Sequence, residues 1–214
     1  MDENSKKHML KTGTTTLGIV TQEGIVLAAD KKATYGSEYG GVSYIAGEVQ
    51  KIHEFNEDII LTIAGAAAAC LRAIQTAKAQ IKIKDLREKK KSTIKEISNL
   101  FSIMAINALQ SGGVISFLLA GKENSKTFFY DVTPDGMARE VKDYKIDGSG
   151  MMHVNAILDT EYKKNISLKE GIALAKRCII GSSGRDPASG IGYEIWTITP
   201  EKIKKIEDKT WELD

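Results

Sequence analysis

The sequence predicts an α+β fold: a four-layer αββα sandwich in which two antiparallel sheets lie face to face and a pair of helices covers each sheet. Three observations predict it. Candidate elements follow the order strands, two helices, strands, two helices, strands. The strands are joined by short turns, and strands joined in this way are antiparallel. The helices are amphipathic, so each pair has an apolar face that can cover one sheet.

The length and composition fit one compact domain. The 214 residues are 42% hydrophobic and 27% charged, which is long enough for one well-buried core and short for two. No repeat or linker divides the chain, so we expect a single domain over residues 14–214. The net charge of +2 and the pI of about 8.3 are too balanced to favour nucleic acid or an anionic membrane as the main partner. A basic run at residues 87–91 predicts a solvated loop.

A β-hairpin is predicted at residues 14–30, where the first strand pattern begins. Residues 14–20 are rich in Thr, Leu, Ile and Val, and residues 25–30 form a second such run after a short turn. Residues 31–50 are rich in Gly and Tyr and alternate only weakly. Residues 59–64 form a third strand, which we expect Gly65 to end as a long helix begins.

Two amphipathic helices follow this third strand. In the first, apolar residues recur at spacings of three and four. Its predicted buried face consists of Ala67, Leu71, Ile74, Ala77 and Ile81. Thr93 and Glu96 form a capping box that begins the second helix, and Gly112 and Gly113 stop it. Its predicted buried face consists of Ile94, Ile97, Phe101, Met104 and Ala108.

The remaining predicted elements lie in the second half of the chain. Its strand candidates are residues 114–120, 127–131, 137–141, 193–198 and 203–206. A short helix is expected at about residues 151–160, and a capping box of Ser167 and Glu170 begins a longer one. The predicted buried face of the longer helix consists of Ile172, Ala175, Cys178 and Ile179. We expect that helix to end in a loop over residues 181–192.

The first 13 residues are polar and carry no periodic pattern, whereas a strand pattern begins at Thr14. They lack the apolar stretch of a secretory signal. No stretch of the chain approaches the 18 apolar residues that predict a membrane span. We therefore expect residues 1–13 to be a detachable segment of a protein that does not cross a membrane.

The two cysteines, Cys70 and Cys178, lie far apart in apolar helical surroundings. The sequence contains no CxxC motif and no Cys/His cluster, so it predicts neither a metal site nor a disulfide framework. Both cysteines are expected to be reduced core residues, which fits a cytoplasmic protein.

Short motifs along the chain resemble those of one protein family. GTTTLGI at residues 13–19 is followed by GIVLAAD at residues 24–30. The further blocks are Lys51-Ile52, Thr62-Ile63-Ala64-Gly65, Gly148-Ser149-Gly150 and Arg185-Asp186-Pro187-Ala188-Ser189-Gly190. Each block alone is weak evidence for a family. Together, in this order and spacing, the blocks are specific for one family. Over residues 14–198 the chain resembles the β subunits of proteasomes, above all those of the archaeal type.

The resemblance implies an N-terminal nucleophile hydrolase with the sandwich fold described above. It implies a threonine endopeptidase that degrades unfolded proteins inside a closed chamber. Such β subunits form homo-oligomeric rings of seven that stack with rings of α-type subunits, and an ATP-dependent unfolding ring supplies the substrate. The resemblance implies no metal or organic cofactor.

A threonine hydroxyl is a poor nucleophile until a base takes its proton. None of the three histidines has a Ser and an Asp at the spacing of a known catalytic triad. The histidines are His8, His53 and His153. The alternative base is a free α-amino group, whose pKa of about 7.7–8.0 lies close to working pH. Thr14 has such a group only if the Gly13–Thr14 bond is cut, and the glycine allows close approach and bending at that bond.

The resemblance also implies roles for further residues. Thr14 is the nucleophile, Lys51 lies beside it and lowers the pKa of its amine, and Asp30 pairs with Lys51. Gly65 is expected to offer its N–H to the oxyanion from the start of a helix. The residues expected to hold the Thr14 nitrogen and a water are Ser149, Asp186 and Ser189. The apolar pocket for the residue before the scissile bond is expected to comprise Ala33, Val49, Ile63 and Ala67.

The sequence departs from the family pattern in three places. The interval from Asp30 to Lys51 is 21 residues, a few more than the family pattern leads us to expect, and we expect the surplus to loop out at residues 36–41. Four alanines at residues 66–69 stand where the family usually has a Ser and, later, an acid. Ile191 stands where an Asp is common. These departures touch the pocket and the loops and leave the nucleophile in place.

Two alternatives accompany the active protease. A catalytically inert structural β-type subunit usually lacks the nucleophile or the lysine, and Thr14 and Lys51 are both present. A different hydrolase of the same fold, acting on small amides, would not be expected to share the blocks at residues 148–150 and 185–190. The sequence therefore favours the active threonine protease.

Overall fold

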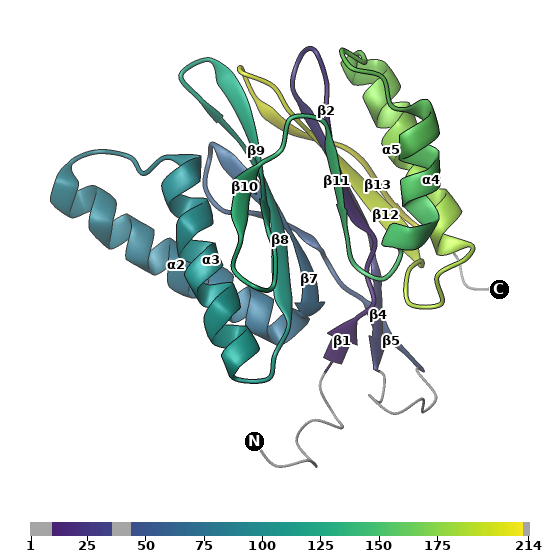
Figure 1. The fold of residues 1–214 in the computed structure, drawn as a ribbon, viewed down its shortest axis with the longest axis horizontal. Helices are drawn as coiled ribbons and strands as arrows, with labels where there is room; N and C mark the ends of the chain where they lie inside the picture. The colour runs from purple at the N-terminus through teal and green to yellow at the C-terminus, as the bar shows by residue number, and fades with distance from the viewer. Residues whose placement is uncertain (1–9, 36–43, 212–214) are drawn as a thin grey trace.

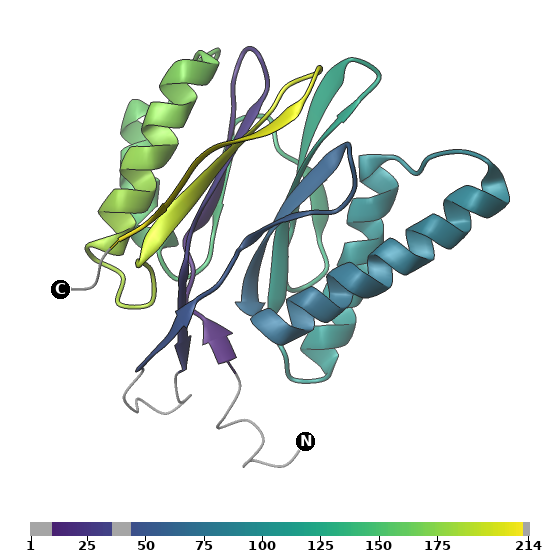
Figure 2. The ribbon, with the colours of Figure 1, turned by 180° about the vertical axis from the view of Figure 1, so that it is seen from behind.

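The computed structural model describes residues 10–35 and 44–211. Its helices are α2 (Ala67–Glu88), α3 (Ile94–Gln110), α4 (Met151–Glu161) and α5 (Leu168–Ser183). Helices α2 and α3 form one outer layer and α4 and α5 the other, with two sheets between them (Figures 1 and 2). None of the helices in the described part of the chain has the length and hydrophobicity needed to cross a lipid bilayer.

Both sheets are antiparallel. The first, called sheet A, has the strand order β10-β9-β8-β7-β1-β4-β5, with β6 also paired to β7. The strands of sheet A are β1 (Leu10–Thr12), β4 (Lys32–Tyr35), β5 (Tyr44–Glu48), β6 (Ile52–Glu54), β7 (Ile59–Ala66), β8 (Ile115–Glu123), β9 (Lys126–Val132) and β10 (Ala138–Glu140). The second, sheet B, has the order β11-β2-β3-β12-β13. The strands of sheet B are β2 (Thr16–Val20), β3 (Ile25–Asp30), β11 (Tyr144–Asp147), β12 (Gly192–Ile198) and β13 (Ile203–Thr210). The predicted αββα sandwich is confirmed.

Three apolar clusters hold the four layers together. One lies between α2, α3 and sheet A, where the rings of Phe101 and Phe117 are 4.6 Å apart. A second lies between α4, α5 and sheet B, with Leu17 and Cys178 fully buried in it. The third lies between the sheets and includes Phe129. Each large side chain buried in this way contributes roughly 1.5–3 kcal/mol, so the layers are fixed relative to one another.

Several predicted elements are confirmed in detail. The strand over residues 25–30 has the predicted bounds. The capping boxes of Thr93 with Glu96 and of Ser167 with Glu170 are both formed. Both signals are local, because a capping box connects residues only three apart.

Two predicted element ends and one predicted buried residue were wrong. Gly65 does not end its strand: β7 continues to Ala66, because a backbone φ of +100° at Gly65 bends the strand without breaking it. Leu71 was expected on the buried face of α2 but is 38% exposed, and Cys70 and Ala73 take that face instead. Helix α5 runs past residue 181 to Ser183.

Short strands account for most of what sequence periodicity did not indicate. Strands β4, β6 and β11 have three or four residues each, too few to display an alternation. Strand β1 lies within the segment predicted to be detachable, where the sequence carries no periodic pattern. Residues 1–9 of that segment and the loop expected at residues 36–41 lie outside the described residues.

Candidate active site

The β2–β3 hairpin brings Thr14 and Asp30 together at one end of sheet B. Thr16 pairs with Ala29, so the residues just before β2 lie beside the last residue of β3. The Thr15 N–H donates to the Asp30 carboxylate Oδ1 at 2.8 Å, and the Asp30 N–H donates to the Thr15 carbonyl at 3.1 Å. The side chain of Asp30 is fully buried, so its carboxylate holds the start of β2 in one position.

Lys51 connects this carboxylate to the bond expected to be cut. Its Nζ lies 2.7 Å from Asp30 Oδ1 and donates to the Gly13 carbonyl oxygen at 2.8 Å. The second carboxylate oxygen of Asp30 accepts from the backbone N–H groups of Lys32, at 3.0 Å, and Gly190, at 2.9 Å. Lys51 is therefore fixed with its positive charge on the carbonyl that immediately precedes Thr14.

Burial and the ion pair act in opposite directions on both partners. Burial lowers the pKa of the Lys51 ammonium below that of an ordinary lysine, and the negative charge of Asp30 opposes this shift. Burial raises the pKa of the Asp30 carboxyl, and the charge and hydrogen bond of Lys51 oppose that shift. Neither charge is shielded by water, so each depends on the other to remain ionised.

The three residues expected to support the Thr14 nitrogen do form one array. The Thr14 N–H donates to Ser149 Oγ at 3.2 Å, and Ser149 Oγ donates to Asp186 Oδ2 at 2.7 Å. Ser189 Oγ donates to the same Asp186 oxygen at 2.6 Å. The Asp186 carboxylate thus accepts hydrogen bonds from two hydroxyl groups. This orients the Ser149 oxygen toward the Thr14 nitrogen. The Gly150 N–H fixes the other side of Thr14 by donating to its carbonyl at 3.2 Å.

Sequence reasoning missed two residues of this array. The Thr15 hydroxyl lies 2.5 Å from Ser182 Oγ and 2.8 Å from Ser189 Oγ. Thr15 and Ser182 are both fully buried, so the three hydroxyls satisfy one another and join β2 to the end of α5. The run of three threonines was the available signal for Thr15, whereas nothing local to the sequence marks Ser182.

Strand β1, which ends at Thr12 just before the Gly13–Thr14 bond, lies in sheet A as an added strand (Figure 1). In β1, Thr12 pairs with Gly65 of β7, and Lys11 pairs with both Ala66 of β7 and Thr34 of β4. The backbone on the N-terminal side of the Gly13–Thr14 bond is therefore held between two strands as an extended peptide. Gly65 faces this peptide from within β7, and not from the start of α2 as the sequence suggested.

The four expected pocket residues lie on or next to the elements that flank β1. Ala33 is in β4, Ile63 is in β7 and Ala67 is the first residue of α2; all three are buried. Val49 is half-buried, and its N–H donates to the Lys31 carbonyl at 2.8 Å. Their side chains are apolar, and β1 lies between the strands that carry Ala33 and Ile63.

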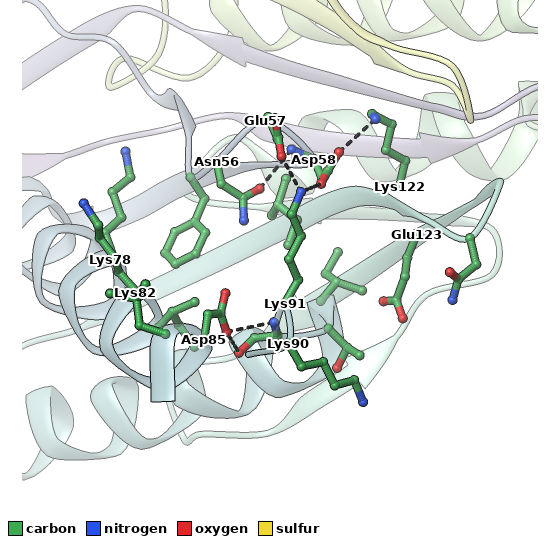
Figure 3. A pocket seen from close by; sticks show the side chains of 18 of the residues that line it. Asn56, Glu57, Asp58, Lys78, Lys82, Asp85, Lys90, Lys91, Lys122 and Glu123 are labelled. Carbon is green, nitrogen blue, oxygen red and sulfur yellow. Dashed lines mark hydrogen bonds and ion pairs between the residues drawn. The ribbon is translucent and has the colours of Figure 1, made fainter. Parts of the chain in front are cut away.

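A groove of about 1180 Å³ lies elsewhere, between the C-terminal part of α2, the α2–α3 connection and two turns of sheet A (Figure 3). It contains none of the expected site residues. The basic run at residues 87–91, which was expected to be a solvated loop, is exposed beside this groove, but Arg87 belongs to the last turn of α2. There Lys91 points toward Glu57 and Asp58 and pairs with both. Such exposed pairs contribute little to stability.

In the described part of the chain, no three or more His, Cys, Asp and Glu side chains gather into a group that could hold a metal ion.

Comparisons with known proteins agree on one family. The sequence matches the family model described as "Proteasome subunit" over residues 10–198. A proteasome subunit beta of Haloferax volcanii is 32% identical over 195 residues, which are 90% of this chain and 76% of that protein. A proteasome subunit beta of Nanoarchaeum equitans is 31% identical over 194 residues, 90% of this chain and 96% of that protein. A proteasome subunit beta 2 of Pyrococcus abyssi is 32% identical over 196 residues, 92% of this chain and 91% of that protein.

Proposed function

The chain belongs to the proteasome subunit family, with β subunits as its relatives, and from that premise we propose that it is a catalytic β subunit: a threonine endopeptidase that frees its own nucleophile by cutting Gly13–Thr14. One observation carries the proposal. The Lys51 ammonium donates at 2.8 Å to the Gly13 carbonyl oxygen, on the bond that directly precedes Thr14. A cation at that oxygen favours addition of a nucleophile to the carbonyl carbon, because negative charge develops there.

Self-cleavage follows from this arrangement. The Thr14 hydroxyl adds to the Gly13 carbonyl carbon, and the oxyanion that forms receives the hydrogen bond of Lys51. The C–N bond then breaks as the Thr14 nitrogen takes, through a water molecule, the proton that the hydroxyl gave up, which leaves Gly13 esterified to the Thr14 oxygen. Water hydrolyses the ester and releases residues 1–13 as a carboxylate. The Thr14 nitrogen is now a free amine, already within reach of Ser149.

The mature site repeats the same chemistry on other polypeptides. The Thr14 amine, held by Ser149, takes the hydroxyl proton through a water while the oxygen attacks the substrate carbonyl. Lys51 favours the neutral amine by its positive charge, and Asp30 holds Lys51. The Gly65 N–H is the second proposed donor to the oxyanion. The protonated Thr14 amine then returns the proton to the substrate nitrogen as the peptide C–N bond breaks and the amine-side fragment leaves. Water hydrolyses the remaining ester and frees Thr14.

Substrates are proposed to bind where β1 lies. An extended peptide can add as a strand to the edges of β4 and β7, so that main-chain hydrogen bonds hold it whatever its sequence. Selectivity then depends on the pocket for the residue before the cut bond. Broad backbone recognition suits a protease that degrades unfolded proteins.

The pocket proposal predicts cleavage after apolar residues. Ala33, Ile63 and Ala67 place no charge near that side chain, so an acidic side chain there would lose its hydration without gaining a partner. Fluorogenic peptides ending in Leu or Tyr should be cut at least roughly tenfold faster than matched peptides ending in Glu or Asp, measured as kcat/KM. Faster cutting of the acidic peptides would contradict the proposed pocket.

Assembly follows from the family. Proteasome β subunits assemble with α subunits into rings, and we propose for this chain homo-oligomeric β rings of seven, fed by an ATP-dependent unfolding ring in the cytoplasm. The intact mass of the subunit after co-assembly with its α-type partner tests the proposed function. Loss of residues 1–13 together with peptidase activity is the expected result. A full-length mass in an assembled, inactive ring would instead support the inert structural subunit.

Gly13→Ala should slow this processing sharply. A Cβ at position 13 would lie 1.8 Å from the Cβ of Ala188, far inside contact distance, so the backbone would have to shift. The shift would move the Gly13 carbonyl away from Lys51, and a misplacement of about 1 Å costs roughly 10²-fold in rate. The rate at which residues 1–13 are lost, followed by intact mass, measures the effect.

Ala188→Gly provides the matched control for this variant. On its own it should leave processing close to the wild-type rate, because the backbone N–H of residue 188 still donates to Asp186. Combined with Gly13→Ala it should recover part of the lost rate, since the nearest clashing atom is gone while the Ala188 backbone, at 2.8 Å, remains close. Wild-type processing by Gly13→Ala alone would show that close approach at this bond is unimportant.

A further inference from the structure

Glu194 is a buried acid for which neither the proposed chemistry nor the sequence motifs give a role. It lies in β12 of sheet B, with 1% of its surface exposed. Its Oε1 accepts from the backbone N–H groups of Ile52, at 2.9 Å, and Lys51, at 3.3 Å. The carboxylate therefore crosses from one sheet to the other and binds the backbone of the residue that carries the ammonium.

Two successive N–H groups converging on one oxygen form a small anion-binding concavity. Lys51 lies just before β6, and among the described strands β6 pairs with β7 alone. The Lys51 carbonyl accepts from the Ile63 N–H of β7 at 2.9 Å, so β7 holds one side of residue 51. Glu194 holds the other side. Without it, two buried N–H groups would lack an acceptor, at a cost of about 1–3 kcal/mol each.

The second carboxylate oxygen of Glu194 is also held. Oε2 accepts from the Trp196 indole N–H at 3.0 Å, and Lys205 Nζ lies 3.9 Å from the same oxygen. Lys205 also lies over the Trp196 ring, 5.1 Å from its centroid. Both oxygens are thus fixed, and the carboxylate cannot turn without breaking one set of contacts.

We propose that Glu194 is a positioning residue: by holding the backbone of Lys51 from the opposite sheet, it sets where the Lys51 ammonium meets the carbonyl of the bond being cut. The role rests on the proposed protease function. The side chain of Lys51 reaches Asp30 and Gly13 from a single backbone position, so a shift of residue 51 moves the ammonium away from both. Substrate binding along β4 and β7 does not involve Glu194, so its loss should affect kcat and leave KM in place.

Glu194→Gln tests this with almost no change of shape. A carboxamide has one acceptor end and one NH₂ end, whereas Glu194 faces N–H donors on both sides. The NH₂ end of the glutamine must therefore face one of these N–H donors, and the side chain must turn or move to avoid it. We expect kcat for peptide hydrolysis to fall roughly 10- to 100-fold, with KM within about twofold of wild type.

Trp196→Phe supplies the rescue. It removes the indole N–H, so in the double variant Glu194→Gln/Trp196→Phe the amide oxygen can face Lys51 and Ile52 while its NH₂ meets no donor from residue 196. The double variant should recover most of the kcat lost in Glu194→Gln. Trp196→Phe alone keeps the Glu194 contacts to the two backbone N–H groups and serves as the matched control for lost packing. Thermal unfolding of all four proteins shows that each is folded.

Amide hydrogen exchange provides a readout that does not need activity. The N–H groups of Lys51 and Ile52 should exchange faster in Glu194→Gln than in wild type, and slow again in the double variant. Unchanged kcat and exchange in Glu194→Gln, or a kcat loss that Trp196→Phe does not relieve, would overturn the positioning role. If wild type itself cuts no peptide, the proposed function fails, and the exchange rates alone then decide whether Glu194 holds residue 51.

Discussion

Thr14→Ala is expected to leave residues 1–13 attached and to abolish peptide hydrolysis. The variant lacks the oxygen that would attack the Gly13 carbonyl, while the Lys51 contact to that carbonyl stays in place. Removing the nucleophile of a hydrolase lowers kcat by on the order of 10⁴- to 10⁶-fold. Intact mass and peptidase activity of the assembled particle, purified in parallel with wild type, measure both effects.

Thr16→Val is the matched control for this experiment. Thr16 is fully buried, and its hydroxyl makes no hydrogen bond to any described residue. Valine has nearly the same shape, so the substitution removes a hydroxyl of the same threonine run without leaving a partner unsatisfied. It should process and hydrolyse peptides like wild type. If Thr14→Ala still lost residues 1–13 at the wild-type rate, another protease would be the processing agent.

Lys51→Met is expected to remove activity and a large part of the stability. The loss of the ammonium leaves the Gly13 carbonyl without its cation and leaves Asp30 charged and fully buried. Breaking a buried ion pair on one side costs about 3–5 kcal/mol. We expect a value at the lower end, because Thr15, Lys32 and Gly190 still donate backbone N–H groups to the carboxylate. Chemical unfolding measures the stability, and intact mass measures the processing.

The double variant Lys51→Met/Asp30→Asn separates stability from catalysis. Neutralising Asp30 removes the uncompensated buried charge, so part of the lost unfolding free energy should return. Processing and hydrolysis should not return, since no cation faces the Gly13 carbonyl. Recovery of activity together with stability would mean that Lys51 acts only through folding, and its proposed catalytic role would then be wrong.

Local patterns in the sequence determined much of the fold. The hairpin of β2 and β3, the two capping boxes and the antiparallel layers all depend on residues near one another in the chain. The order of the motifs was sufficient to predict the family. The family pattern then identified Thr14, Asp30 and Lys51 as candidate catalytic residues. The structure brings these three together, and their catalytic roles stay predictions until the variants above are measured.

Only the tertiary structure decided how the site is supported. Glu194 meets the backbone of Lys51 across 143 positions of the chain, and Thr15 meets Ser182 across 167. The place of Gly65 within β7 and of β1 between β4 and β7 likewise depends on which strands are neighbours in sheet A. Such contacts leave no periodicity in the sequence, because a buried polar group is satisfied by whatever donor the packed layers bring to it. The sequence determined which groups can do the chemistry, and the packing of the two sheets decided which of their neighbours hold them in place.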